Sequence, residues 1–316
     1  MNLTLAIPAR DDAEGLVRLL DRAARLGCAS HAVVVDDGSA EPLDADRLTA
    51  AAGMAPGHLI LLRNETSCGV GAARNQALAL VETDHLLFLD ADDLPARELA
   101  DLLADLDGQD FDFCLFQHHD SRAGTERRWG QMPWDQRFWH AAGVETGALS
   151  PVPPAAAAQL VQTANYPWNK VYRTAFLREN GIGCTGIEVH EDVELHWMSF
   201  LRARGILASD RVCAVHFVAP GGGRLTNRTG PERLEVFGPL AHIADEIAGT
   251  EDSPFALPFY RFALGLCAWI AANLRPEFHD ELAARAARFA AGMPAPVRDA
   301  LRGSDPGLLD RFPPAP

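Results

Sequence analysis

The sequence lacks a Cys-x-x-Cys pair, an excess of basic residues, and a basic and apolar leader ahead of its first strand pattern. The six cysteines are widely scattered, which indicates buried free thiols in a reducing compartment rather than disulfides. The formal net charge of −15 argues against nucleic acid as a partner, because a phosphate backbone needs a basic face. Met1 leads directly into an apolar strand pattern, so we expect no signal peptide. The expected location is the cytoplasm, with peripheral contact at the inner face of the membrane as an option.

A length of 316 residues, 48% of them hydrophobic, is enough for one large α/β domain with its own core. In the first half, apolar strand patterns alternate with helical patterns. The strands are expected at residues 3–8, 32–35, 59–62 and 86–89, and the helices at residues 14–26 and 72–81. This alternation predicts a mostly parallel central sheet flanked by helices. Ligands of such sheets bind beyond the carboxyl ends of the strands, which is where the polar residues of this sequence gather.

The second half is less regular. Strand patterns at residues 111–116 and 211–217 flank a Trp-rich irregular stretch, and a helix is expected from about Glu191 to Arg204. Beyond residue 230 the pattern is helical throughout, which predicts an α/β domain at residues 1–230 and a C-terminal helical subdomain at residues 231–316.

The stretch at residues 255–274 carries one formal charge over almost a membrane-spanning length. Interruptions at Pro258 and Gly265 favour a packed core helix or dimer-interface helix over a transmembrane span. The apolar surface of this helix predicts a partner that covers it, either a second copy of the chain or the membrane surface.

Asp90 and Asp92 follow directly after an apolar strand pattern. Residues two apart in an extended segment point to the same side, so these carboxylates can hold one divalent cation, Mn²⁺ or Mg²⁺. Such a cation would neutralise the charge that develops on a diphosphate leaving group. The alternative is an aspartate cluster that caps the next helix, ahead of Pro95. A second acidic pair, Asp36 and Asp37, ends an earlier strand in the same way and favours the metal interpretation.

Six short segments together resemble the large inverting glycosyltransferase family 2, whose members have the GT-A fold. The segments are LAIPARD at residues 5–11, VVDDGS at 34–39, NETSCGVGAARN at 64–75, FLDADD at 88–93, WNKVYR at 168–173 and HED at 190–192. The WNK form is similar to bacterial members that build capsular or other surface polysaccharides. The resemblance fades after about residue 230.

The resemblance implies roles for the matching positions. Asp36 would accept an N–H of uracil or another base, and Arg74 would lie near the base or the diphosphate. Asp92 would bind Mn²⁺ or Mg²⁺, Asp90 would approach the ribose or the metal, and Asp192 would be the catalytic base. The residues expected to bind the donor are Pro8, Ala9, Arg10, Asp36, Arg74, Asp90, Arg224 and Arg228. The residues expected near the acceptor or the donor sugar are Trp168, Asn169, Lys170 and Glu191.

Elementary chemistry agrees with the role of Asp192. An inverting transfer is one in-line displacement, so it needs one carboxylate to take the proton of the acceptor hydroxyl. It does not need the close carboxylate pair of a retaining hydrolase. We expect the helix that begins here to lower the pKa of Asp192 and keep it ionised. The alternative is that Glu191 and Asp192 only complement the helix dipole.

Three glycines at residues 221–223 precede Arg224, and Arg228 follows. They predict a mobile loop whose arginines close over a diphosphate, with a linker between domains as the alternative. The triple glycine departs from the Arg/Pro-Gly-Ser segment that family members often carry here. His216 ends the preceding strand and is a candidate third metal ligand, although a strand-end histidine is more often merely exposed or satisfied.

The expected function is a metal-dependent inverting transfer of a sugar from a nucleotide diphosphate donor, first of all a UDP-sugar, to a saccharide or lipid-linked acceptor hydroxyl in cell-surface polysaccharide synthesis. Two other classes stay open: a nucleotidyltransferase and a catalytically silent nucleotide-sugar-binding protein. The first would need a glycine-rich basic loop after the first strand, where the sequence reads PARDD at residues 8–12. The intact Asp-x-Asp and Glu-Asp pairs argue against the second.

Overall fold

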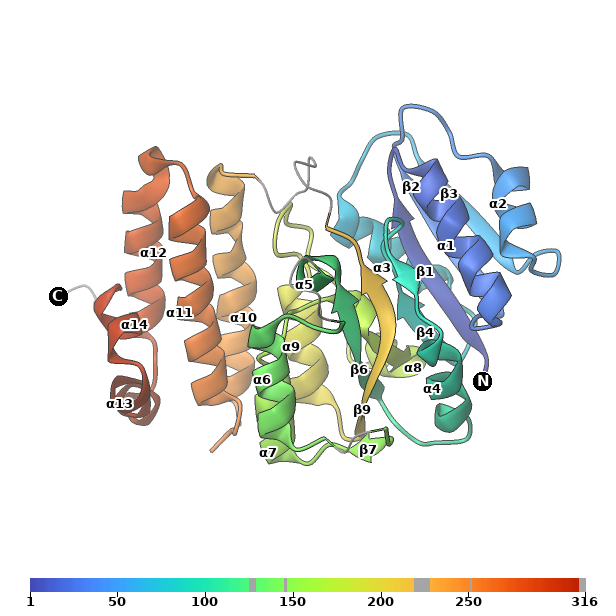
Figure 1. Ribbon diagram of the computed structural model, residues 1–316. Coiled ribbons are helices and arrows are strands. Elements are labelled where there is room, and N and C mark those ends of the chain that lie inside the picture. The colour runs from blue at the N-terminus through green and yellow to red at the C-terminus, as the bar shows by residue number, and fades with distance from the viewer. Residues whose placement is uncertain (125–128, 145–146, 219–227, 251, 313–316) are drawn as a thin grey trace.

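The structure is a computed structural model that describes residues 1–124, 129–144, 147–218, 228–250 and 252–312 (Figure 1). Its strands are β1 (Leu3–Ala9), β2 (His31–Asp37), β3 (Leu59–Asn64), β4 (His85–Phe88), β5 (Leu94–Pro95), β6 (Phe113–Asp120), β7 (Ser150–Pro151), β8 (Lys170–Arg173) and β9 (Ile206–His216). Within these residues they form one nine-stranded sheet in the order β3-β2-β1-β4-β8-β6-β9-β5, with β7 paired to β9.

The first half of the chain confirms the predicted alternation. Strands β1 to β4 lie parallel to one another, and helices connect them. These helices are α1 (Ala13–Leu26), α2 (Ala45–Ala52) and α3 (Val70–Leu80). Local chemistry sets their ends: Asp12 caps α1 by accepting from the Gly15 amide at 2.9 Å, and Gly27 ends it in a left-handed conformation.

The second half holds more structure than the sequence pattern predicts. Strand β8 inserts between β4 and β6 and runs antiparallel to both. The stretch expected to be irregular contains helices α5 (Ser121–Gly124), α6 (Pro133–Ala142) and α7 (Pro154–Leu160), and the last two begin with a proline. Proline is favoured in the first turn of a helix, where its missing N–H costs nothing.

Six of the nine strands point the same way. Since β8 is antiparallel to both β4 and β6, those two share a direction, and β9 is parallel to β6. The carboxyl ends of β1 to β4, β6 and β9 therefore meet at one edge of the sheet, which is where the candidate site lies.

Helices cover both faces of the sheet. On one face lie α1 and α4 (Glu98–Leu106), and on the other lie α3, α8 (Thr174–Glu179) and α9 (Val193–Arg202). Each face has its own hydrophobic core, and wholly buried strands such as β1 contribute to both. Five of the six cysteines are buried free thiols, as expected, and Cys68 is exposed.

The region after residue 230 is helical, as predicted. Its helices are α10 (Phe237–Ala248), α11 (Ala256–Asn273), α12 (His279–Ala291), α13 (Ala295–Ser304) and α14 (Pro306–Asp310), with short 3₁₀ turns η3 (Pro231–Val236) and η4 (Pro276–Phe278). Helices α10 to α12 stand side by side on the opposite side of the molecule from α1 and α2 (Figure 1).

The sequence predicts that an external partner covers the apolar surface of α11. In the structure, helices of the same chain cover most of that surface. Helices α10, α12, α13 and α14 pack against α11. Its buried residues are Pro258, Phe259, Tyr260, Ala263, Leu264, Cys267 and Ile270. No helix in the described part of the chain has the length and apolarity to cross a membrane. A homodimer or membrane contact through these helices stays a prediction.

Candidate active site

The strand ends place polar groups in register along the sheet edge. Ala9 at the end of β1 pairs with Asp36, and Asp37 at the end of β2 pairs with Asn64. A cleft of about 820 Å³ opens beyond these ends. It is lined by Pro8, Ala9, Arg10, Asp11, Asp37, Ser67, Cys68, Gly69, Val70, Gly186, Ile187, Glu188 and Arg228.

The cleft brings together four of the residues predicted to bind the donor. Pro8, Ala9 and Arg10 come from the end of β1, and Arg228 comes from more than two hundred residues later in the chain. The Arg228 side chain pairs with Glu188 across the rim. The other predicted arginine, Arg224, and the glycines before it lie outside the described residues.

Asp37 lines the cleft and holds its neighbouring loop in place, a role that the sequence motifs did not predict. Its carboxylate accepts hydrogen bonds from the Ser67 hydroxyl at 2.6 Å, the Cys68 amide at 2.8 Å and the Gly69 amide at 3.0 Å. Burial opposes ionisation, but these hydrogen bonds lower the pKa of Asp37 to about 2. Asp37 therefore holds the loop before α3 as a permanently charged anchor.

The neighbouring Asp36 is fully buried. It accepts from the Ser39 amide at 2.9 Å and the Leu43 amide at 3.3 Å, and it forms an ion pair with Arg63. Both carboxylate oxygens thus already have partners within the protein, so a nucleobase N–H would have to share one of them. The base-binding role of Asp36 stays a prediction.

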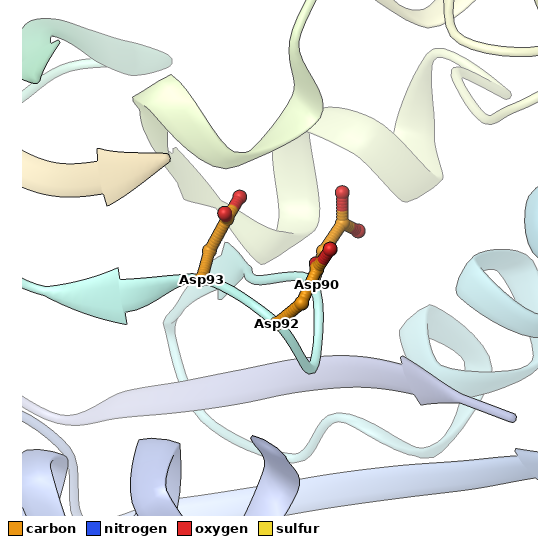
Figure 2. Close-up of side chains that lie close together, drawn as sticks. All are labelled: Asp90, Asp92 and Asp93. Carbon is orange, nitrogen blue, oxygen red and sulfur yellow. The ribbon is translucent and has the colours of Figure 1, made fainter. Parts of the chain in front are cut away.

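Three carboxylates cluster in the turn between β4 and β5. Oxygens of Asp90, Asp92 and Asp93 lie within 4.8 Å of one another, and Figure 2 shows the three side chains on the same side of the loop. Asp92 is exposed, Asp90 is half-buried and Asp93 is buried. The Asp-x-Asp motif predicts two of these carboxylates, and the third, Asp93, was missed.

The cluster fits a hard divalent cation. Carboxylate oxygens are the ligands that Mg²⁺ and Mn²⁺ prefer. Three carboxylates each offer one oxygen here, and one of the three, Asp92, is exposed to solvent. Burial raises the pKa of Asp93 to about 6, the His216 hydrogen bond opposes this, and the charges of Asp90 and Asp92 add to it. A bound cation would relieve the repulsion among these groups.

His216 contacts the buried member of the cluster, Asp93. Its Nδ1 lies 2.9 Å from Oδ1 and 3.0 Å from Oδ2 of Asp93, and the Phe217 amide donates to the same carboxylate at 3.1 Å. His216 also stacks on Trp168, with the ring centroids 4.9 Å apart. The sequence predicts His216 as the third metal ligand, whereas the third side chain of the carboxylate cluster is Asp93. Direct metal ligation by His216 stays a prediction.

Arg74 joins this cluster to the second acidic segment. Its buried guanidinium donates to Asp90 at 2.6 Å and to Glu191 at 2.8 Å. Val70 lines the cleft one helical turn before Arg74 on α3, so the cleft and the cluster are adjacent. Arg74 was predicted to bind the donor, and Glu191 was predicted to lie near the acceptor or the donor sugar. In this structure the two side chains bind each other.

Asp192 is the N-cap residue of α9 and keeps a partly accessible surface. Burial among protein groups and then the Glu191 charge raise the pKa of Asp192 to about 8, although Arg74 and Lys170 act in the opposite direction. The expectation that the helix would lower this pKa is therefore wrong. Desolvation outweighs the helix dipole, which is worth about 1 kcal/mol or less at most sites.

Trp168, Asn169 and Lys170 form a buried segment next to His216 and Asp192. All three are buried, and Lys170, the only lysine of the chain, donates to Asn169 Oδ1 at 2.6 Å and to the Tyr166 carbonyl at 2.8 Å. Burial lowers the pKa of Lys170 to about 7, against the attraction of Asp192 and Asp135. Lys170 thus lies near enough to Asp192 for their charges to interact, and contact of the three residues with a sugar stays a prediction.

The match to a known family covers the four of the six motif segments that lie within residues 4–155. Residues 4–155 match the family model described as Glycosyl transferase family 2. The chain is similar to the pre-mycofactocin glycosyltransferase of Mycobacterium tuberculosis, at 39% identity over 98 residues, 30% of this chain and 19% of that protein. It is also similar to the succinoglycan biosynthesis protein ExoU of Rhizobium meliloti, at 36% identity over 112 residues, 35% of this chain and 32% of that protein. The matched stretches span less than a third of the length of these curated relatives.

Solved structures extend the likeness to almost the whole chain. TarS 1-349 from S. aureus, in complex with UDP-GlcNAc, has a TM-score of 0.75 at 20% identity, over 99% of this chain and 89% of that chain. The mannosyltransferase PcManGT from Pyrobaculum calidifontis, in complex with GDP-Man and Mn²⁺, has a TM-score of 0.54 at 17% identity, over 98% and 80%. At these identities the likeness shows the fold, a GT-A-like α/β sheet with C-terminal helices.

Proposed function

Since residues 4–155 match the family model described as Glycosyl transferase family 2, we propose that the protein transfers a sugar from a nucleotide diphosphate donor to an acceptor hydroxyl, with inversion and with a divalent cation. The observation that carries the proposal is the position of Arg74 between the carboxylate cluster, the acidic segment and the cleft. This arginine binds Asp90 of the carboxylate cluster and Glu191, which directly precedes Asp192, and it lies one turn along α3 from the cleft. Arg74 thus contacts the cation site and the residue before the candidate base, and it lies next to the donor cleft.

The residues divide the chemistry among them. Asp92, Asp90 and Asp93 would hold Mn²⁺ or Mg²⁺, and a bound cation would neutralise the developing charge on the diphosphate leaving group. Asp192 would take the proton of the acceptor hydroxyl as the new bond to the anomeric carbon forms. One base suffices for a single in-line displacement, which supports inversion.

The donor cleft supports a nucleotide as its ligand. It combines apolar surface from Pro8, Ala9 and Val70 with the charged groups Arg10 and Arg228. We infer that the base and ribose lie against the first set, while the arginines approach the phosphates. The similar TarS structure contains UDP-GlcNAc, so UDP-sugars are the first donors to test. We propose a saccharide or lipid-linked acceptor in surface polysaccharide synthesis, and the likeness to the succinoglycan biosynthesis protein supports a role in polysaccharide synthesis.

A thermal-shift panel tests the proposal. Nucleotide sugars with uracil or guanine bases are added to the full chain with Mn²⁺, with Mg²⁺ or with EDTA. A true donor at a hundred times its Kd stabilises the fold by about 2.7 kcal/mol, and we expect this only with a cation. Donor hydrolysis is then followed with the same ligands. Stabilisation without any hydrolysis or transfer would indicate a silent binding protein, and equal stabilisation in EDTA would contradict the metal requirement.

A further inference from the structure

His190, directly before Glu191 and Asp192, has a left-handed backbone. Its φ angle is +69°, a conformation that residues other than glycine rarely adopt. Such a conformation persists only where the surroundings hold it. The carbonyl of the next residue, Glu191, is held by the Thr185 amide at 2.9 Å, but this bond does not account for the ring of His190.

Two residues from the C-terminal region hold that ring. Arg233 in η3 places Nη1 3.4 Å from Nε2 of His190, and Trp269 in α11 meets the imidazole edge to face at a centroid distance of 5.7 Å. Burial and then the Arg233 charge lower the pKa of His190 to about 4, so the imidazole is neutral and can accept from the guanidinium.

Arg233 is fully buried although it carries a charge. Its guanidinium stacks over the Trp269 ring at 4.5 Å, and its Nε donates to the carbonyl of Arg228 at 2.5 Å. Arg228 lines the donor cleft. One side chain therefore touches both Arg228, which lines the cleft, and His190, two residues before the candidate base.

We propose that Arg233 and Trp269 are positioning residues that hold His190 in its left-handed conformation and thereby orient Glu191 and Asp192. The inference rests on the proposed function, because it gives the C-terminal helices a role in transfer. A rotation at His190 would move Glu191 away from Arg74 and Asp192 away from the acceptor. Misplacement of a reacting group by about 1 Å can cost roughly 100-fold in rate.

The first experiment compares Arg233→Met with Arg275→Met in the full chain. Arg275 is the matched control, since its guanidinium also lies over a ring of the C-terminal region, that of Phe278, but is exposed. We expect Arg233→Met to lower kcat roughly 10- to 100-fold and to raise the donor KM, because it also releases the Arg228 carbonyl. Hydrogen exchange should rise in peptides covering residues 185–196 for Arg233→Met only.

The second experiment separates backbone conformation from ring contacts. His190→Val and His190→Gly both lose the imidazole, but valine resists a positive φ and glycine accepts it. We expect His190→Gly to keep at least about ten times more of kcat than His190→Val, with the donor KM of both near the wild-type value. Far-UV circular dichroism and melting curves verify that each variant is folded.

Two results would overturn the inference. One is equal hydrogen exchange at residues 185–196 in the Arg233 and Arg275 variants, which needs no activity at all. The other is an active wild-type protein for which Arg233→Met has the same kcat as Arg275→Met, and His190→Gly has the same kcat as His190→Val. An inactive wild-type protein whose exchange still responds to Arg233→Met would instead contradict the proposed function and leave the positioning contact established.

Discussion

At the scale of single residues, Arg74 connects two acidic segments more than a hundred positions apart in the chain. One terminal nitrogen reaches Asp90 and the other reaches Glu191, which the planar fork of a guanidinium permits and a lysine ammonium does not. The charge of Arg74 also offsets part of the repulsion among carboxylates that burial brings together. The geometry of the cation site and that of the candidate base are therefore coupled through one side chain.

The carboxylate cluster gives the first prediction at this scale. Asp92→Asn should abolish cation-dependent nucleotide binding without loss of stability, because the Asp92 side chain is exposed. Asp93→Asn should also lower the free energy of unfolding by about 1–3 kcal/mol, since it weakens buried hydrogen bonds with His216 and the Phe217 amide. Urea denaturation and nucleotide titration with Mn²⁺ measure the two effects. Full nucleotide affinity in the Asp92 variant would contradict the metal assignment.

The raised pKa of Asp192 predicts the pH dependence of transfer. A base must be ionised, so kcat/KM for the donor should rise with pH until about 8, the pKa of Asp192 in the free protein, and level off above it. Glu191→Gln removes a negative charge that raises this pKa, so the rising limb should move to lower pH. Asp192→Asn is the control, because it should lose the limb together with at least about 100-fold in rate. A profile already flat above pH 5 would mean that Asp192 is not the titrating base.

At the scale of elements, the close approach of α3 to the acidic segment explains Gly71. A Cβ at this position would lie 2.3 Å from the Thr185 carbonyl oxygen and 3.0 Å from Cγ of Glu191. Only glycine lets the helix that carries Arg74 pack this closely on the segment that carries Glu191.

Gly71→Ala should therefore displace Glu191 and lower transfer activity, and it should also destabilise the fold. The matched control is Gly265→Ala in the interior of α11, where a Cβ meets nothing within 4 Å. That change should stabilise the protein by about 0.5–1 kcal/mol, as alanine does in a helix interior. Melting temperatures and donor turnover of both variants are the measurements. Equal effects of the two substitutions would show that the contact at Gly71 is not tight in solution.

The elements of the first half could be predicted because their signals are local. Strands buried on both faces read as apolar runs, and each ends at a polar motif such as Asp36-Asp37 or Asp90-Ala91-Asp92. Strand β8 was missed because it is four residues long and its place between β4 and β6 depends on long-range pairing. The helices α6 and α7 were missed because their prolines and tryptophans were taken as signs of irregular structure, although proline suits a first helical turn.

The site residues that directly follow a strand could be predicted from the sequence. The position of Asp93 next to the Asp-x-Asp motif carries no pattern of its own, and its role appears only when β9 brings His216 to it. The pKa of Asp192 could not be predicted from a helix start alone. It depends on burial, which raises the pKa, and on the charges of Glu191, Arg74 and Lys170, which the fold brings to Asp192.

At the scale of the whole molecule, the C-terminal helices share a core with the α/β sheet. One continuous hydrophobic cluster contains Val33 and Phe88 from the sheet and Phe259, Leu282 and Phe312 from the C-terminal region. Helix α10 packs on α9, which begins at Asp192. The predicted boundary near residue 230 thus separates two sequence patterns, while the core runs across it.

Trp197 on α9 is central to this shared core and gives the last prediction. It is fully buried, and its ring lies 5.2 Å from both Phe259 and Phe262 of α11. A chain that ends at residue 230 would expose this ring and its neighbours, so we expect that truncation to be insoluble. In the full chain, Trp197→Ala should cost about 3–5 kcal/mol of unfolding free energy, because it leaves a cavity between the two parts.

Trp134→Ala is the matched control, since Trp134 is 46% exposed and its loss should cost less than about 1 kcal/mol. Urea denaturation followed by circular dichroism gives both free energies, and the denaturant slope reports whether the two parts still unfold together. A soluble, active monomer from the truncated chain would overturn the idea of a shared core. So would a Trp197 variant as stable as the Trp134 variant, because the α9–α11 contact would then contribute no stability.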